Sequence, residues 1–280
     1  IDTCVEAGIP MLDVPPVKQW IKGELSFKQL KPIPVEDILD RDVITLNKSA
    51  IAKSIEGKRI MITGAAGSIG SEICRQLIHY SPESLLLVDQ AESPLHALSL
   101  ELAEAEAGIK IDLILGDITD ASHMRSLIEK NRPQVLYHAA AYKHVPLVEA
   151  NAVEGIKTNV LGTRSLTDLA LEFKVERFVL VSTDKAVNPT NVMGATKRAA
   201  EIYVQSRPAG NTIFITTRFG NVLGSNGSVI PLFKEQIEKG GPITVTHPDI
   251  ERYFMTIPEA SQLVLEAAAM GEGNNIFVFD

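Results

Sequence analysis

An acid and a base stand side by side in this sequence, at Asp184 and Lys185, two residues after the mostly apolar run 177–181. A carboxyl group and an amine placed together can serve as a general acid and a general base, because each can donate or accept a proton. Neighbouring groups of this kind titrate as a coupled pair. An Asp-Lys pair in a loop is more often solvated surface, so the pair indicates catalysis only if the fold brings it to a ligand-binding cleft.

A glycine-rich segment supplies a second chemical pattern, reading Thr-Gly-Ala-Ala-Gly-Ser-Ile-Gly after a short apolar run. Gly64 permits a tight turn, Gly67 lets the backbone approach a pyrophosphate, and Gly70 lets the next helix pack closely on a sheet. The N–H groups where that helix starts, around Ser68 and Ile69, attract phosphate charge. Three glycines alone are a weak signal, but a strand before them and a helix after them favour nucleotide binding over an ordinary turn.

Acidic residues end the next two apolar runs. Asp89 lies close to the offset of about 20 residues at which a carboxylate binds the adenosine ribose. A carboxylate there accepts two hydroxyl hydrogen bonds and repels a 2′-phosphate, and no arginine follows it, so the sequence favours NAD over NADP. Asp117, followed by Ile118, is placed to bind the adenine amino group. A role for Asp117 at a helix N-terminus is nearly as well supported.

These residues need a framework, and from residue 57 the chain alternates short apolar runs with helical patterns. The expected strands are 59–63, 85–88, 111–115, 135–138, 177–181 and 212–217. The expected helices include 94–107, 147–173, 191–205, 229–239 and 258–270. Short apolar strands separated by helices form a parallel sheet that is buried on both faces. We therefore expect an α/β fold with a doubly wound parallel sheet of about six strands, with ligands at the carboxyl ends of the strands.

The domain organisation is predicted from a change in the sequence pattern along the chain. Residues from about 15 to 56 lack regular alternation and contain prolines at 15, 16, 32 and 34, which predicts a connecting segment. Residues 1–56 are therefore expected to be a linker and the remnant of a preceding domain. Residues 57–280 are expected to form the nucleotide-binding domain, with the substrate portion mainly at 219–280. The chain opens at Ile1 and closes in the strand-like run 275–280, so we expect a fragment of a longer protein whose substrate portion is truncated.

Composition limits the function further. The 280 residues carry 27 Lys+Arg against 35 Asp+Glu, a net charge of −8, which argues against a nucleic-acid backbone as the main partner. With 45% apolar residues the chain can bury a sizeable core. Cys4 and Cys74 have neither a disulfide pattern nor metal-ligand spacing, which indicates a reducing cytoplasm and no metal site. The sequence has no signal peptide and no apolar run of about 18 to 20 residues, so no membrane contact is expected for this fragment.

Several motifs together resemble the extended short-chain dehydrogenases/reductases. They are the glycine loop, the strand end Tyr137-His138-Ala139-Ala140-Ala141, Asn159, and the Met193-x-x-x-Lys197 step. Three segments, 141–146, 182–186 and 218–228, are more narrowly similar to the polysaccharide-biosynthesis 4,6-dehydratases that act on UDP-N-acetylglucosamine. The resemblance starts near Asp37. The segment before it is similar to the tail of the preceding domain in long members anchored in the bacterial inner membrane, which implies that this part is cytoplasmic.

The resemblance implies a reaction and roles in it. The sugar would lose a hydride from C4 to bound NAD⁺, lose water across C5 and C6, and regain the hydride at C6. Lys185 would be the base at C5, and Asp184, protonated, would donate to the departing hydroxyl. Thr183 would contact the sugar hydroxyl, and Lys197 would bind the nicotinamide ribose.

The remaining implied contacts divide between cofactor and sugar nucleotide. The cofactor would be framed by Asn159 and Ser182, by Ala139, Ala140 and Ala141, and on the nicotinamide side by Lys143. Candidates for the sugar nucleotide are Lys143, His144, Asn221, Ser228 and Arg252. Ser228 starts a helix whose N-terminus could face a diphosphate, and Arg252 offers a bidentate fork. His144 could as easily be a structural histidine.

One position departs from the wider superfamily. The usual tyrosine, which removes the proton from the oxidised hydroxyl, is Met193 here, and a thioether has no proton to exchange. The long members that this chain resembles also carry Met at this step. The C4 hydroxyl proton must then leave through Thr183, Lys185 or water.

The expected function is a hydro-lyase: an NAD-dependent UDP-N-acetylglucosamine 4,6-dehydratase that serves capsule, O-antigen or glycoprotein sugar synthesis. A nucleotide-sugar 4- or 5-epimerase is one alternative, and a nucleotide-binding module without turnover is another. The expected partners are a UDP-sugar and a second copy of the chain, paired through the helices at 147–173 and 191–205.

Overall fold

The computed structural model describes residues 12–13, 31–32, 48–104, 108–208, 210–225, 229–245, 247 and 253–279. The chain divides into two compact units, Ile1–Ile44 and Thr45–Asp280. In the first unit, β1 (Leu12–Asp13) and β2 (Lys31–Pro32) pair in antiparallel fashion. The candidate site lies in the second unit.

A seven-stranded parallel sheet forms the centre of the second unit, in the order β11-β8-β7-β6-β3-β4-β5. Its strands are β3 (Arg59–Thr63), β4 (Ser84–Asp89), β5 (Lys110–Leu115), β6 (Val135–His138), β7 (Arg177–Thr183), β8 (Ile213–Phe219) and β11 (Asn275–Val278). The doubly wound parallel sheet predicted from the sequence is confirmed. It has one strand more than expected, because the run 275–278 pairs with 215–218 of β8.

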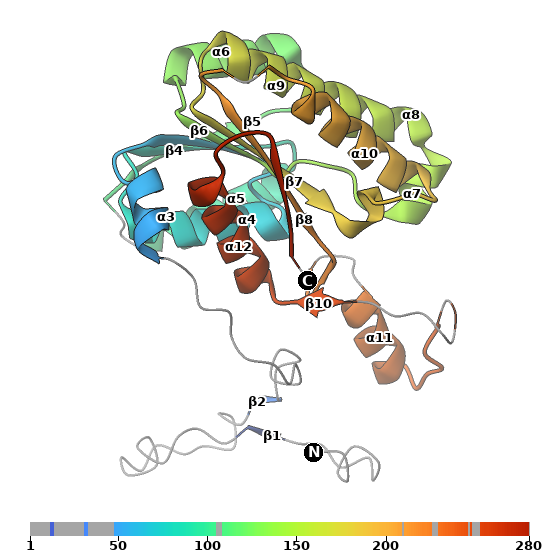
Figure 1. Cartoon of the computed structure of the whole chain (residues 1–280). Helices are drawn as coiled ribbons and strands as arrows, with labels where there is room; N and C mark the ends of the chain where they lie inside the picture. The colour runs from blue at the N-terminus through green and yellow to red at the C-terminus, as the bar shows by residue number, and fades with distance from the viewer. Residues whose placement is uncertain are drawn as a thin grey trace, which may run out of the picture. The chain divides into compact units, whose positions relative to one another are not determined.

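Helices cover both faces of this sheet (Figure 1). One face is packed by α3 (Lys48–Ile55), α4 (Ser68–Leu77), α5 (Glu92–Glu104) and α12 (Ile257–Met270). The other is packed by α6 (Ala121–Asn131), α9 (Thr163–Glu172) and α10 (Val192–Gln205). The strand order reverses between β3 and β6, and in such sheets ligands bind at the carboxyl ends of the strands beside the reversal.

The domain boundary was expected at residue 57, where the alternating strand and helix patterns begin. The compact unit in the structure starts earlier in the chain. Helix α3 buries Ile51 and Ile55 in the same core as β3 and α4. The two isoleucines are four residues apart, so they lie on one face of the helix. A helix of this length with one pair of buried residues gives only a weak helical periodicity in the sequence. It was therefore not distinguished from the proline-containing segment that precedes it.

The long helix expected at 147–173 is divided into four segments. They are α7 (Val145–Ala150), α8 (Ala152–Gly155), the π-helical η4 (Ile156–Gly162) and α9. The first break is at Asn151, whose φ of −132° is not helical. The π-helical segment places Asn159 at its centre, and π-helical turns are frequent at functional sites.

The shorter elements complete the unit. They are η3 (Ile78–Tyr80), η5 (Asp184–Ala186), β9 (Asn221–Val222), α11 (Val229–Glu238) and β10 (Phe254–Met255). Strands β9 and β10 pair in parallel and form a small second sheet. Within the described part of the chain, no helix combines the length and the apolar character needed to cross a bilayer.

Candidate active site

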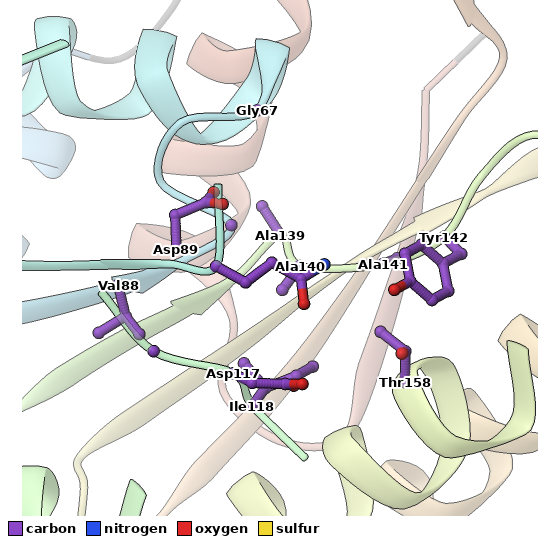
Figure 2. Close-up of a pocket in the computed structure, with 13 residues that line it drawn as sticks. Gly67, Val88, Asp89, Asp117, Ile118, Ala139, Ala140, Ala141, Tyr142 and Thr158 are labelled. Atoms are coloured by element: carbon purple, nitrogen blue, oxygen red, sulfur yellow. The ribbon is translucent and has the colours of Figure 1, made fainter. Parts of the chain in front are cut away.

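A pocket opens at the carboxyl ends of β3, β4, β5 and β6 (Figure 2). Its lining includes Gly64, Gly67, Asp89, Asp117, Ile118, Ala139, Ala140 and Ala141, all of which the sequence singled out. The sequence did not single out Val88, Gln90, Gly116, Tyr142 or Thr158, which also line it. Figure 2 shows Asp89 on the side of the glycine loop and Tyr142 with Thr158 on the opposite side.

Glycine is required in the loop by close backbone contacts. Gly64 has a φ of +70°, and a Cβ there would lie 2.5 Å from the Ala140 nitrogen. A Cβ on Gly70 would lie 2.0 Å from the Gly64 carbonyl oxygen. A Cβ on Gly67 meets only that same oxygen, at 3.2 Å. Because Ser68 begins α4, the loop leads the chain directly into a helix N-terminus.

Asp89 holds the glycine loop in place while it lines the pocket. One of its carboxylate oxygens accepts the Ala66 N–H at 2.9 Å, and the other accepts the Ala91 N–H at 2.9 Å. Asp117 accepts the Thr119 N–H at 2.8 Å. The residue that caps α6 is Asp120, and Asp117 lies three residues before it, at the pocket wall.

The acid–base pair lies directly after β7, with Lys185 Nζ 3.0 Å from Asp184 Oδ1. The Thr183 hydroxyl donates to the same Asp184 oxygen at 2.8 Å. Lys185 Nζ also donates to Asn221 Oδ1 at 3.2 Å, which brings β9 to the pair. Three residues predicted to act on the substrate and one predicted to bind it are therefore one hydrogen-bonded group.

Helix α10 packs tightly against this group. A Cβ on Gly194 would lie 2.3 Å from the Lys185 carbonyl oxygen, so the first turn of α10 fits there only with glycine. Met193, just before it, is buried. One turn further on, Lys197 is buried and donates to the Val181 carbonyl oxygen at 2.7 Å. Burial lowers the pKa of Lys197 to about 8.

A buried carboxylate, Glu201, was missed in the sequence. It accepts hydrogen bonds from the Ser182 hydroxyl at 2.7 Å, from Arg218 at 2.8 and 2.6 Å, and from Arg198 at 3.1 Å. Burial alone would raise the pKa of Glu201, but these hydrogen bonds lower it below its ordinary value. Glu201 thus joins the ends of β7 and β8 to α10. Its position four residues after Lys197 on a helix was the available signal.

Other predicted residues lie where their roles are less direct. Asn159 is fully buried, accepts the Tyr142 N–H at 2.8 Å and donates to the Tyr142 carbonyl oxygen at 3.0 Å, so it fixes the pocket wall rather than facing the pocket. Lys143 is exposed beside that wall, and His144 occupies the N-cap of α7. Ser228 and Arg252 lie outside the described residues.

A buried histidine links the glycine loop to the π-helical segment. His138 Nδ1 and Nε2 each lie 2.8 Å from a threonine hydroxyl, that of Thr63 and that of Thr163. The Thr163 hydroxyl donates to the Asn159 carbonyl oxygen at 2.7 Å, so it accepts from Nε2–H, and Nδ1 accepts from Thr63. Burial lowers the pKa of His138 to about 3, so the ring is neutral.

The neutral histidine predicts a loss of stability in acid. Between about pH 6.5 and the folded-state pKa of about 3, the unfolded chain binds a proton at residue 138 that the folded chain does not. The free energy of unfolding should therefore fall with decreasing pH, by up to about 1.4 kcal/mol per unit from this group. Urea unfolding of His138→Gln at several pH values should show a shallower slope than the parent. The exposed-site control His79→Gln should keep the parent slope, and equal slopes in all three proteins would contradict the assignment.

Both fold and site thus define an extended short-chain dehydrogenase/reductase. The sequence profile of the family described as "Polysaccharide biosynthesis protein" matches residues 60–280, and the chain belongs to this family. It is 47% identical over 280 residues to "Capsular polysaccharide biosynthesis protein CapD" of Staphylococcus aureus, covering 99% of this chain and 47% of that protein. The chain thus spans about half the length of that relative.

Relatives with named activities are more distant. "UDP-N-acetylglucosamine 4,6-dehydratase (inverting)" of Campylobacter jejuni is 34% identical over 228 residues, 79% of this chain and 66% of that protein. "UDP-glucose 4-epimerase" of Rickettsia canadensis is 35% identical over 229 residues, 79% of this chain and 65% of that protein. Among solved structures, Pen from Bacillus thuringiensis has a TM-score of 0.76 and 34% identity, covering 81% of this chain and 70% of that one. DesIV, a dTDP-glucose 4,6-dehydratase from Streptomyces venezuelae, was solved with NAD bound and has a TM-score of 0.70 at 23% identity. The match covers 79% of this chain and 74% of that one, and it supports the fold alone.

Proposed function

We propose that this chain is the catalytic part of an NAD-dependent 4,6-dehydratase that converts UDP-N-acetylglucosamine to a 4-keto-6-deoxy sugar nucleotide for surface polysaccharide or glycan synthesis. The observation that carries the proposal is the contact of Lys185 with Asp184 at the carboxyl end of β7. An amine and a carboxyl group in contact are what loss of water from neighbouring carbons requires, since one proton must leave C5 and another must reach the oxygen on C6.

The glycines and carboxylates of the pocket lining suit a dinucleotide. A Cβ at Gly64 or Gly70 would collide with backbone atoms, and Gly67 lines the pocket without a side chain that could keep a pyrophosphate away. Asp89 lines the same pocket and would accept hydrogen bonds from the ribose hydroxyls. Asp117 and Ile118 line the same pocket, which supports the proposal that they contact the adenine. When bound, NAD⁺ accepts a hydride from the sugar and returns it.

The chain's own residues supply binding and proton transfer. Lys197, held against the Val181 carbonyl, would bind the nicotinamide ribose, with Ser182 nearby on the same strand end. Lys185 would take the C5 proton while Asn221 keeps its amine in position. The proposed substrate contacts of Lys143, His144, Ser228 and Arg252 stay predictions that these geometries do not test.

Assembly and location are also proposals. Exposed apolar side chains on α8, η4 and α10, including Val153, Ile156 and Ile202, support a dimer through these helices. Attachment of the whole protein to the inner membrane stays a prediction. A relative from Methanocaldococcus jannaschii is named "Uncharacterized membrane protein MJ1061" and is 46% identical over 232 residues.

The test is to incubate the protein with UDP-N-acetylglucosamine and NAD⁺ and to measure the product mass. Loss of one water is the expected result. A product of unchanged mass with altered stereochemistry would support the epimerase that the Rickettsia relative suggests. Retention of both ligands with no product would support a binding module. A parallel reaction with UDP-glucose tests the preference for the acetamido sugar.

A further inference from the structure

We propose that Glu201 is a positioning residue for the cofactor: it fixes Lys197 against the end of β7 and supplies the negative charge that the buried amine of Lys197 requires to bind the nicotinamide ribose. Glu201 itself touches neither cofactor nor substrate in this role. The inference rests on the proposed contact of Lys197 with the ribose, and it does not depend on the reaction that follows.

The placement of the two side chains is the first observation. Lys197 and Glu201 lie four residues apart on α10, so they share one face of this helix. That face is buried, since Lys197 is 4% and Glu201 0% exposed. The Val181 carbonyl oxygen on β7 accepts from Lys197 Nζ at 2.7 Å. The next residue of the strand, Ser182, donates its hydroxyl to Glu201 Oε1 at 2.7 Å. Consecutive residues of β7 therefore hold the two members of the pair.

The hydrogen bonds of Glu201 establish that it is a carboxylate. Arg218 on β8 donates to both of its oxygens, at 2.8 and 2.6 Å, which is a bidentate pair. Arg198 donates to Oε2 at 3.1 Å. Burial alone would raise the pKa of Glu201, but these hydrogen bonds bring it below its ordinary value. Glu201 is thus negative at neutral pH and anchored to the ends of two strands.

Lys197 depends on a charge of this sign because its amine is removed from water. Burial lowers the pKa of Lys197 to about 8, and the Glu201 carboxylate acts against burial by favouring the protonated amine. An ammonium has three N–H groups, and the contact with the Val181 carbonyl uses one of them. A protonated Lys197 can therefore donate charge-assisted hydrogen bonds to ribose hydroxyls. Without the charge of Glu201 the amine would lose its proton at a lower pH.

The other charged or titratable groups around Lys197 do not supply this charge. His138, on β6, interacts with Lys197, but its ring is neutral because burial lowers its pKa to about 3. Asp184 and Lys185 belong to η5, which packs against α10, and they pair with each other at 3.0 Å. The charged side chains of α7, α8 and η4, which also pack against α10, are exposed. Glu201 is the carboxylate that raises the pKa of Lys197.

The test measures NAD⁺ affinity by calorimetry from about pH 6 to about pH 10, across the titration of lysine 197. The parent should lose affinity progressively above about pH 8. Lys197→Met should remove this pH dependence, which assigns it to the amine. Glu201→Gln keeps the shape and removes the charge, so the loss of affinity should begin at least about one pH unit lower. Glu201→Asp keeps the charge and should restore the onset toward that of the parent, even where its shorter side chain weakens binding at every pH.

A second variant covers the risk that Glu201→Gln does not fold. Arg218, 12% exposed in its side chain, loses its carboxylate partner there, and an unpaired charge in that place destabilises the fold. The double variant Glu201→Gln, Arg218→Gln removes both charges and should show the same lowered onset. Glu129→Gln, at an exposed site on α6, is the control and should keep the parent onset.

The pH dependence separates this role from a merely structural one. A structural Glu201 would change NAD⁺ affinity by the same factor at every pH. An unchanged onset in the folded charge-removing variants would therefore overturn the proposal. A parent whose affinity is constant over this pH range would overturn the ribose contact of Lys197 and the role of Glu201 together. Absence of a dehydrated product would refute the proposed reaction alone, because turnover is not part of this measurement.

Discussion

Replacing Lys185 by alanine should stop the loss of water while the first oxidation continues. The C5 proton then has no acceptor, because the amine that lies 3.2 Å from Asn221 Oδ1 is gone, whereas Thr183 and Asp184 remain. We expect dehydration to fall by at least about 10²-fold, the span that general-base catalysis contributes. Reduced nicotinamide and a 4-keto sugar that retains its C6 hydroxyl should accumulate, measured by absorbance and by product mass.

Two further variants test whether Lys185 acts as a base or only through its charge. Lys185→Arg keeps the positive charge and most of the length, but a guanidinium is not deprotonated in proteins, so dehydration should be lost there too. Lys130→Ala removes an exposed lysine from α6 and should leave the reaction at the parent rate. Dehydration by Lys185→Arg at the parent rate would show that residue 185 acts by charge and is not the C5 base.

Gly64→Ala should destroy nucleotide binding and weaken the fold. Its φ of +70° disfavours any side chain, and the new Cβ would lie 2.5 Å from the Ala140 nitrogen and 2.7 Å from the Ala139 carbonyl carbon. The left-handed conformation and the overpacking together should cost about 2 to 5 kcal/mol of unfolding free energy. Relief of the clash must separate the glycine loop from β6, so NAD⁺ affinity should fall by more than about tenfold, each tenfold being 1.4 kcal/mol.

The matched control is Gly273→Ala, where an ideal Cβ meets no described heavy atom within 4 Å. It should change neither the urea midpoint nor the NAD⁺ affinity measured by calorimetry. If Gly64→Ala bound NAD⁺ as tightly as this control, the glycine loop would not be the phosphate cradle, whatever its effect on stability.

The sheet could be predicted because its strands are short, apolar and regularly spaced between helical patterns. The glycine loop could be predicted because a tight turn and a close helix approach have few sequence solutions. Asp89 and the 183–185 group followed from one rule, that ligands bind where parallel strands end. These features depend on local sequence, and the structure keeps them.

Other features depend on distant partners and could not be predicted from local patterns. Nothing in the periodicity around Asn159 predicts a π-helical turn. Its side chain, which was expected to frame the cofactor, holds the backbone of Tyr142, a residue of the pocket lining. The Ser182 hydroxyl donates to Glu201 on α10, and the burial of that carboxylate becomes apparent only in the folded structure. The predicted place of Ser182 beside the cofactor stays a prediction. Likewise, α3 joins the core through its contact with α12, some 200 residues later in the chain.

The central claim is that the hydride taken from C4 is returned to C6 of the same sugar after water has left. The most direct measurement uses UDP-N-acetylglucosamine carrying deuterium at C4, with unlabelled NAD⁺, followed by product mass and NMR. We expect a product that is lighter by one water and carries the deuterium at C6. Deuterium retained at C4 in a product of unchanged mass would contradict it and would identify the chain as an epimerase.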